Sequence, residues 1–195
     1  YNHANIRTSG KICGGLVGYA SSKTDLTVSN SYHVGNLTDS GGYCGMIGYY
    51  NTGDSSMYPT AITVKNCFST ADLKDSSVAN LSSVESYSGS AKLSSARMIS
   101  AAPSLGSAFI ADCEWENDGY PVFTWQCETV LPEDLHLSTA AELRLFAHTV
   151  NTGDTYAGKT VYLDKDVDLD SREWIPIGGN ASEDGTSRIR FSGTF

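Results

Sequence analysis

The chain has 195 residues, of which 40% are hydrophobic and only 18% are charged, and its formal net charge is -9. A chain of this length can bury a core without help from disulfides or metals. The acidic balance excludes the Lys/Arg stripe that contact with a nucleic-acid backbone requires, and no apolar run reaches the roughly 18 residues that span a bilayer. The abundance of Ser, Thr, Gly, Asn and Tyr favours short strands joined by turns.

A glycine-rich segment occurs twice in the first part of the chain. GGLVGYA, residues 14–20, returns as CGMIGYY, residues 44–50. The glycines of the two copies align in pairs: Gly15 with Gly45, and Gly18 with Gly48. We expect them to supply positive φ angles and close backbone approach where the chain turns a corner.

The match continues beyond the glycines. LTVSNSYHVGNL, residues 26–37, aligns with ITVKNCFSTADL, residues 62–73, and the second copy carries a short insertion in a turn-rich stretch. Residues 1–6 align with residues 32–37 as a truncated further copy. Repeats of about 30 residues are typical of solenoids, in which each unit buries its apolar face against the next.

Alternation of apolar and polar residues predicts a strand in the longer matched segment. Leu26 and Val28 point to one face of it and the intervening polar residues to the other. Asn30 and Asn66 share the position before a bend, so we expect their amides to bond the turn or each other. The predicted fold class is all-β, with parallel β-helix (solenoid) segments and one capping α-helix in the C-terminal part.

These motifs resemble a known family. Gly15-Leu16-Val17-Gly18 followed by Asn30-Ser31-Tyr32 resembles the GLUG repeat, found in large surface proteins of Gram-positive bacteria and in the non-catalytic part of IgA peptidases. LGSAFIADCEWENDGYPVFTWQ, residues 105–126, resembles the segment that closes such a module, and residues 138–179 resemble the segment that opens one. Cys44 and Met46 depart from the family pattern. The resemblance implies a non-catalytic role at a cell surface.

The resemblance also predicts the domain organisation. We interpret residues 1–127 as the C-terminal part of one GLUG-type β-helix module, and residues 128–195 as the helix-capped N-terminal part of a second. Both chain ends fall inside a repeat, and the chain opens on Tyr1 with neither a basic nor an apolar signal region, so we expect the natural protein to continue beyond both ends. Pairing of the open strand edges between copies is the alternative.

The second module contains the one long helix that the sequence predicts. Thr139 and Glu142 fit a capping box at its start, and Gly153 follows its end. Its apolar face has helical spacing: Leu143, Phe146, Ala147 and Val150. We expect this face to cover the open end of the second solenoid. A shorter helix is predicted over residues 95–102, stopped by Pro103.

Cysteines and histidines give no metal-binding spacing. The five cysteines contain no CxxC pair: Cys13, Cys44, Cys67, Cys113 and Cys127. We favour structural thiols over metal ligands, and if one disulfide forms we expect it between Cys113 and Cys127. The four histidines lack HxH or HxxxH partners, and we interpret them as solvent-facing turn residues: His3, His33, His136 and His148.

An acidic row in LDKDVDLD, residues 163–170, is the most distinct charged feature. In a strand it would place four carboxylates on one face: Asp164, Asp166, Asp168 and Asp170. Such a row could hold Ca²⁺, which takes oxygen ligands. The EF-hand pattern is absent, so we favour a solvated acidic face and expect no other cofactor.

No catalytic constellation stands out. The glycine pairs lack the Lys-Ser/Thr of a phosphate loop, no GxSxG frames a serine, and no carboxylate pair suits glycoside chemistry. We therefore predict a protein that is not an enzyme and assign no catalytic residue. A carbohydrate-binding or carbohydrate-active β-helix protein is one alternative, with stacking faces drawn from Tyr19, Tyr49, Tyr50, Tyr58 and Trp174.

The predicted function is that of a structural or adhesive module of a secreted bacterial cell-surface protein. It would act as a spacer or a surface-binding scaffold outside the cell. Its partners would be adjacent modules, other copies of itself, or a host or cell-surface glycan or protein, with no nucleic acid and no membrane insertion. A self-assembling extracellular filament subunit is the other alternative.

Overall fold

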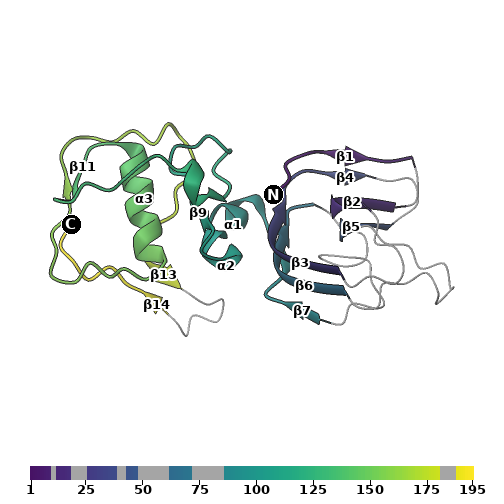
Figure 1. Cartoon of the computed structure of the whole chain (residues 1–195). Helices are drawn as coiled ribbons and strands as arrows, with labels where there is room; N and C mark the ends of the chain where they lie inside the picture. Colours follow the sequence, from purple (N-terminus) through teal and green to yellow (C-terminus); the bar gives the residue numbers. More distant parts are fainter. Residues whose placement is uncertain (10–11, 19–25, 39–42, 48–61, 72–85, 181–187) are drawn as a thin grey trace. The chain divides into compact units, whose positions relative to one another are not determined.

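The computed structural model describes residues 1–9, 12–18, 26–38, 43–47, 62–71, 86–180 and 188–195. They form two compact units (Figure 1). The N-terminal unit comprises Tyr1–Met98 with Ser104–Gly106, and the C-terminal unit comprises Ile99–Pro103 with Ser107–Phe195. In the described part of the chain, none of the helices has the length and apolar character needed to cross a bilayer.

Short parallel strands build the N-terminal unit. They are β1 (Ile6–Arg7), β2 (Ile12–Val17), β3 (Leu26–His33), β4 (Leu37–Thr38), β5 (Tyr43–Ile47), β6 (Ile62–Ser69), β7 (Ser86–Ser88) and β8 (Ala91–Lys92). β1 pairs with β4, β2 with β5, and β3 with β6, whose other edge pairs with β7 and β8. Every one of these pairs is parallel, as stacked repeat copies require.

The strand register confirms most of the repeat alignment. Leu26 pairs with Ile62, and the pairing continues along β3 and β6 to His33 and Ser69. The truncated copy also pairs as aligned, since Ile6 lies opposite Leu37.

The glycine segment pairs differently from the alignment. Gly14, and not Gly15, lies opposite Gly45, and a register irregularity follows before Val17 pairs with Ile47. The alignment of Gly15 with Gly45 is therefore wrong by one residue. The matched spacing is restored only at the end of the strand.

A further rung, formed by β7 and β8, was missed in the sequence. In SYSGSAK, residues 86–92, Tyr87 lies opposite Val64 and Ala91 lies opposite Phe68, so the residues of β6 are not repeated and the repeat signal is lost. Gly89 occupies the place of Asn66 with φ +64°, and a Cβ there would lie 2.6 Å from the Asn66 Oδ1. Ser90 Oγ accepts a 2.9 Å hydrogen bond from the Cys67 N–H.

The core of the N-terminal unit consists of repeat-equivalent side chains. Its fully buried cluster is Met46, Ile47, Val64 and Cys67, with Leu16, Val17, Leu26 and Val28 packed against it. Thr27 and Ser29 are exposed, as the alternation predicts. The β3 and β6 copies thus contribute apolar side chains at matched positions, such as Val28 and Val64.

The chain passes from the N-terminal unit to the C-terminal unit within two short helices. α1 (Ser95–Ile99) ends earlier than predicted, and α2 (Ala102–Leu105) begins after a two-residue break. Pro103 does not stop the first helix but lies in the first turn of the second, where its missing N–H leaves no helix bond unmade.

The C-terminal unit combines one long helix with short strands. β9 (Phe109–Ile110) and β10 (Val122–Phe123) are antiparallel, and the 3-10 turn η2 (Thr124–Gln126) follows. β11 (His136–Leu137) is parallel to β12 (Tyr162–Leu163), and β13 (Gly179–Asn180) is antiparallel to β14 (Arg188–Ile189). The long helix is α3 (Ala140–Asn151).

α3 begins and ends as its sequence predicts. Thr139 Oγ1 accepts from the Glu142 N–H at 3.2 Å, and the Glu142 carboxylate accepts from the N–H groups of Ser138 and Thr139. Gly153 follows with φ +118°. The predicted capping box is confirmed.

α3 buries a wider face than the predicted stripe. Phe146 and Val150 pack with Leu135, Leu137, Tyr156 and Val161 in one cluster. Leu145, outside the predicted stripe, packs on the other side with Ala111 and Cys113, and Cys127 borders the same cluster. The predicted boundary between two sequence modules after Cys127 stays a prediction.

The predicted all-β, parallel β-helix fold is wrong. The described residues form separate sheets of two to four strands, two of them antiparallel, together with helices, and no closed solenoid is present among them. The physical reason is clearest in the C-terminal unit, where the core is the apolar surface of α3 and the strands around it are only two residues long. α3 is thus a central element and not a cap on a coil.

Candidate functional site

The acidic row does not form the predicted strand. β12 ends at Leu163, and the four aspartates that follow are all exposed. Asp168 Oδ1 accepts a 2.8 Å hydrogen bond from the Asp170 N–H, and Asp170 and Ser171 have positive φ angles of 57° and 56°. The segment is irregular and ends in a turn, in which the Arg172 N–H donates to the Leu169 carbonyl.

These carboxylates also do not gather into a metal site. Within the described ranges, no three His, Cys, Asp or Glu side chains converge where they could hold a metal ion. Asp164 turns to His136 and Asp168 bonds its own turn. The row therefore gives no geometric support to calcium binding.

Gly15 is required by close packing rather than by its φ angle. It is absent from the glycines with positive φ, and a Cβ built on it would lie 2.6 Å from Cγ of His33. Gly18 meets nothing within 4 Å. The role expected for these glycines, positive φ at a corner, is wrong for both, while Gly45 is a buried strand residue and Gly48 lies outside the described residues.

The two repeat asparagines do make the amide contact expected from their shared position. Asn66 Nδ2 donates to Asn30 Oδ1 at 3.0 Å, and both residues have positive φ angles, 49° for Asn30 and 51° for Asn66. Asparagine tolerates this backbone region better than most residues. Both asparagines lie within the long strands, so the contact joins the same position of two stacked copies.

His33 is buried, which corrects its interpretation as a solvent-facing residue. Its side chain is 0% exposed, and its Nε2 lies 3.1 Å from the Ala4 carbonyl oxygen while its Nδ1 has no partner. Burial lowers the pKa of His33, with the Ala4 carbonyl acting in the opposite direction. His33 is therefore a neutral packing residue inside the repeat.

The aromatic residues proposed as stacking faces are placed unevenly. Tyr19, Tyr49, Tyr50 and Tyr58 lie outside the described residues. Trp174 is partly buried. A stack that follows the repeat is present at Tyr1 and Tyr32, whose rings lie 5.0 Å apart at 10°.

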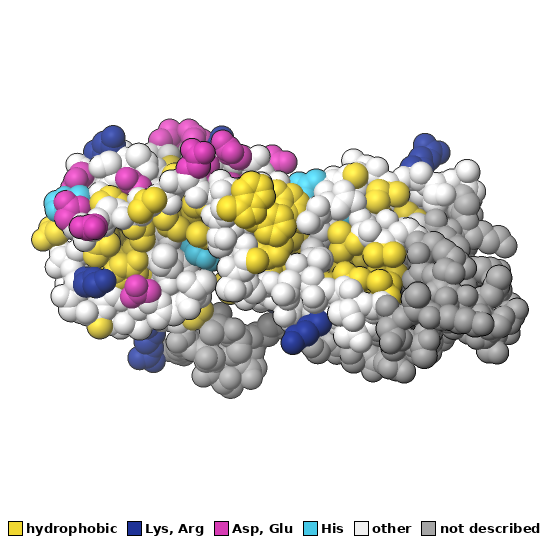
Figure 2. Space-filling view, in the orientation of Figure 1, with side chains coloured by type: hydrophobic (Ala, Val, Ile, Leu, Met, Phe, Trp, Pro, Cys, Tyr) yellow, Lys and Arg dark blue, Asp and Glu magenta, His cyan; other side chains and the backbone are white. Residues whose placement is uncertain are grey.

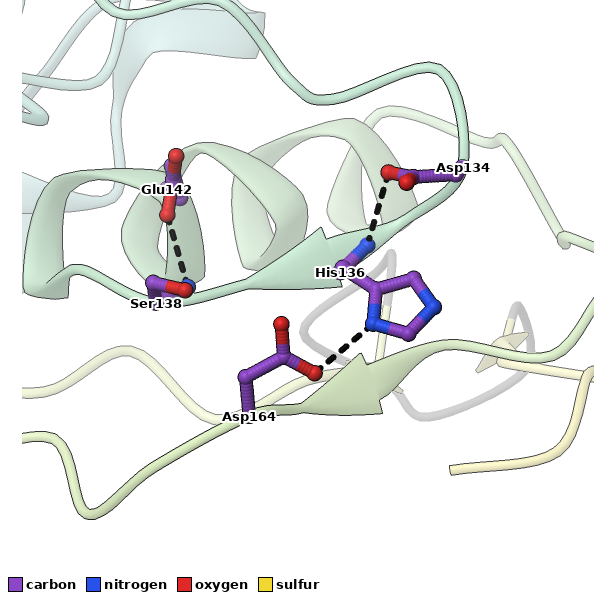
Figure 3. A network of polar contacts seen from close by, with 5 residues as sticks. All are labelled: Asp134, His136, Ser138, Glu142 and Asp164. Atoms are coloured by element: carbon purple, nitrogen blue, oxygen red, sulfur yellow. Dashed lines mark hydrogen bonds and ion pairs between the residues drawn. The ribbon is translucent and has the colours of Figure 1, made fainter.

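The surface cluster of His136, Tyr162 and Asp164 was not found from the sequence. Figure 3 shows its His136–Asp164 contact. The parallel ladder of β11 and β12 creates it, because the Tyr162 and Asp164 N–H groups donate to the carbonyls of Leu135 and Leu137. This places His136 beside Tyr162, with ring centroids 4.4 Å apart at 18°. His136 Nδ1 lies 2.7 Å from Asp164 Oδ1, and both side chains are over 40% exposed.

This surface cluster has the chemistry of a binding surface. Asp164 offers carboxylate oxygens, Tyr162 offers an aromatic face that is 49% exposed, and His136 offers its Nε2 while its Nδ1 faces Asp164. The Asp134 carboxylate lies nearby, 3.4 Å from the His136 N–H. In the described part of the chain no hydroxyl or thiol hydrogen-bonds His136, so the arrangement lacks the nucleophile of a catalytic triad. No sequence spacing predicts it, since His136 and Asp164 are joined only by strand pairing.

A second polar cluster that the sequence analysis missed is structural. The buried Asp112 carboxylate accepts from the N–H groups of Glu116, Asn117 and Gly119 and so organises the turn after β9. The Arg144 guanidinium donates to the carbonyls of Cys113 and Leu169. The run of turn residues in WENDGY was the available signal for this turn.

The arginine stacking in this region supports the same interpretation. Arg144 and Arg172 both lie over the Trp115 ring, at 5.2 and 5.6 Å from its centroid. Burial lowers the pKa of Arg144, and the charge of Arg172 lowers it further. The guanidinium of Arg144 joins three segments of the C-terminal unit.

Charge is distributed unequally over the molecule. Figure 2 shows Asp and Glu side chains gathered over the C-terminal unit. The described residues of the N-terminal unit include no Asp or Glu. Neither described surface carries the basic stripe of a nucleic-acid-binding protein. In comparisons with known proteins, no family model, no curated protein and no solved structure matches the chain.

Proposed function

We propose that the chain is a non-catalytic structural or adhesive module of a secreted bacterial cell-surface protein, of the GLUG-repeat type, working as a spacer or surface-binding scaffold. The observation that carries the proposal is the parallel, in-register pairing of β3 with β6, which stacks one repeat copy on the next. A stack of this kind lengthens whenever a copy is added, because each copy offers the next the same edge. That property suits a spacer.

The contacts between copies support this role. The Asn66–Asn30 hydrogen bond and the Tyr1–Tyr32 ring stack join equivalent positions without charged groups. Such contacts respond little to ionic strength. A surface protein that meets changing salt conditions benefits from that independence.

The adhesive form of the proposal is favoured by the surface cluster of His136, Tyr162 and Asp164. An exposed aromatic face beside carboxylate acceptors suits the apolar face and hydroxyl groups of a sugar. We propose a cell-surface glycan as its ligand. The neighbouring acidic side chains make a neutral glycan a better candidate than an anionic one.

Bead adhesion tests the adhesive form directly. Beads coated with the full chain are passed over glycan-coated and cell-coated surfaces, and retention is measured with and without soluble glycans. We expect retention that one neutral glycan class competes away and that Tyr162→Ala reduces at least tenfold. Trp125→Ala is the matched control, because Trp125 is also an exposed aromatic residue, at 78%.

The outcomes separate the forms of the proposal. If Tyr162→Ala beads are retained as strongly as wild-type beads, the proposed glycan site is wrong. If no surface retains the wild-type beads, only the spacer form of the proposal remains. The spacer is tested by single-molecule stretching of tandem copies, where a reproducible unfolding force is expected. Measured turnover of any glycan by the purified chain would overturn the non-catalytic assignment.

A further inference from the structure

Two cysteines of the C-terminal unit share one packed site beside α3. Cys113 is 0% exposed and belongs to the cluster of Ala111 and Leu145, and Cys127 packs against that cluster from the segment after η2. The Cys113 thiol donates to the Ala111 carbonyl oxygen at 3.3 Å, and each of the two thiols shifts the pKa of the other. Cys67, by contrast, lies in a cluster that contains no second described cysteine.

We propose that Cys113 and Cys127 are a redox pair that forms an intramolecular disulfide under oxidising conditions. The bond would close the loop that carries Trp115, β10 and the exposed Trp125. This inference stands apart from the proposed function, because purified protein tests it whatever the module does at a cell surface.

The surroundings favour uncharged sulfur over thiolate. Burial raises the pKa of Cys113, and the neighbouring Cys127 raises it further. Burial and then the Glu114 charge raise the pKa of Cys127, whose Sγ lies 3.8 Å from Glu114 Oε1. A metal ion would need thiolates here, which burial and the carboxylate oppose, whereas a disulfide carries no charge.

Glu114 is held in place by its own contacts. Its Oε1 accepts from the Thr129 N–H at 2.6 Å and from the Thr129 hydroxyl. Cys127 Sγ also lies 3.8 Å from the Thr129 carbonyl oxygen. These bonds tie Glu114, the residue after Cys113, to the segment that carries Cys127.

The reaction balances with a small disulfide as oxidant. The half-buried Cys127 thiolate attacks glutathione disulfide, forms a mixed disulfide and releases one glutathione thiolate. The Cys113 thiolate then attacks the Cys127 sulfur, forms the intramolecular bond and releases the second glutathione. Two protein thiols are oxidised, one glutathione disulfide is reduced, and the two protons pass to the glutathione thiolates.

Thiol mapping of the wild-type full chain tests the proposal without any variant. The protein is equilibrated with glutathione mixtures, quenched in acid, denatured, treated with N-ethylmaleimide and digested with trypsin. Residues 98–144 contain no internal Lys or Arg, so one peptide carries both Cys113 and Cys127 and no other cysteine. We expect this peptide to take two labels from the reduced sample. From the oxidised sample we expect no label and a mass lower by two hydrogen atoms.

Other labelling patterns overturn the proposal. Two labels at every glutathione ratio mean that the pair does not oxidise. A glutathione adduct on Cys127 with a labelled Cys113 means that Cys113 cannot complete the exchange. A peptide linked to Cys13, Cys44 or Cys67 means that the partner is wrong.

Thermal unfolding supplies an independent readout. Closing a loop of about 15 residues should raise the Tm of the oxidised protein on the order of 10 °C over the reduced protein. Cys127→Ser should abolish this difference, while Cys67→Ser, in the N-terminal unit, should keep it. Redox dependence that persists in Cys127→Ser would contradict the pairing.

Discussion

In the N-terminal unit, neighbouring strands repeat the same contacts at equivalent positions, whereas in the C-terminal unit α3 packs against segments that share no pattern with it. Val64 of β6 and its counterpart Val28 of β3, for example, pack into the same cluster. Phe146 instead meets Tyr156, Phe191 and Phe195, which come from unrelated segments. The first unit distributes its stability over rungs, and the second concentrates it at one helix.

The largest effect is expected where stability is concentrated. Phe146→Ala removes a ring that is 0% exposed and should lower the free energy of unfolding of the C-terminal unit by about 3–5 kcal/mol. The three tryptophans all lie in that unit, so their fluorescence follows its unfolding in urea. Leu163→Ala alters a side chain that is 44% exposed and should change the free energy of unfolding by less than about 0.5 kcal/mol. A change below about 1 kcal/mol for Phe146→Ala would show that α3 is not the centre of the core.

A glycine pair sharpens the comparison in the N-terminal unit. Gly15→Ala forces a Cβ against the buried His33 ring and should cost roughly 1–3 kcal/mol. Gly18→Ala meets nothing within 4 Å and should be neutral or slightly stabilising. Hydrogen exchange of the β3 and β6 amides measures both. Equal effects of the two substitutions would mean that contact with His33 does not select glycine at position 15.

Acidification should lower the stability of the N-terminal unit, because His33 is buried there. The unfolded chain binds a proton on His33 near its ordinary pKa of 6.5, while the folded state holds its pKa lower because of burial. The unfolded state therefore binds more protons as pH falls below about 6.5, and stability falls with it at up to about 1.4 kcal/mol per pH unit. Hydrogen exchange of the β3 amides measures the slope of stability against pH. The range is about pH 7.5 to 5, which lies above the pKa of ordinary carboxylates. His33→Asn should flatten the slope, and an unchanged slope in that variant would assign the effect elsewhere.

The smallest effect is expected at the start of α3. Thr139→Ala removes the oxygen that accepts from the Glu142 N–H and should cost about 1 kcal/mol in urea unfolding followed by tryptophan fluorescence. Thr139→Ser keeps an acceptor and should recover most of the loss. Equal losses in the two variants would place the cause in the threonine methyl group and not in the cap.

Local chemistry made part of the fold predictable. The capping box of α3 depends on residues three positions apart, and the Asn30–Asn66 contact follows from equal positions in two copies. Where the signal was weaker, prediction failed. β7 and β8 keep the rung pairing although their residues differ from those of β6. Leu145 lies outside the predicted stripe because that stripe assumed one packing partner, whereas α3 packs into two clusters.

The candidate site could not be found in the same way. His136 and Asp164 lie on different strands, and only the pairing of β11 with β12 brings them to 2.7 Å. The burial of His33 likewise depends on Gly15 and Ala4, which contact it from other segments. Neither fact has a signature in the residues next to these histidines.

By itself the sequence determined the repeat, the register of its long strands, and the limits of α3, because hydrogen bonds and alternation act between residues at fixed spacings. Only the tertiary structure decided that the repeats form small separate sheets, that α3 is the core of its unit, and that His136, Tyr162 and Asp164 share a surface. Those outcomes depend on which apolar faces meet. That choice is made by the total surface buried between distant segments, and no single stretch of sequence contains it.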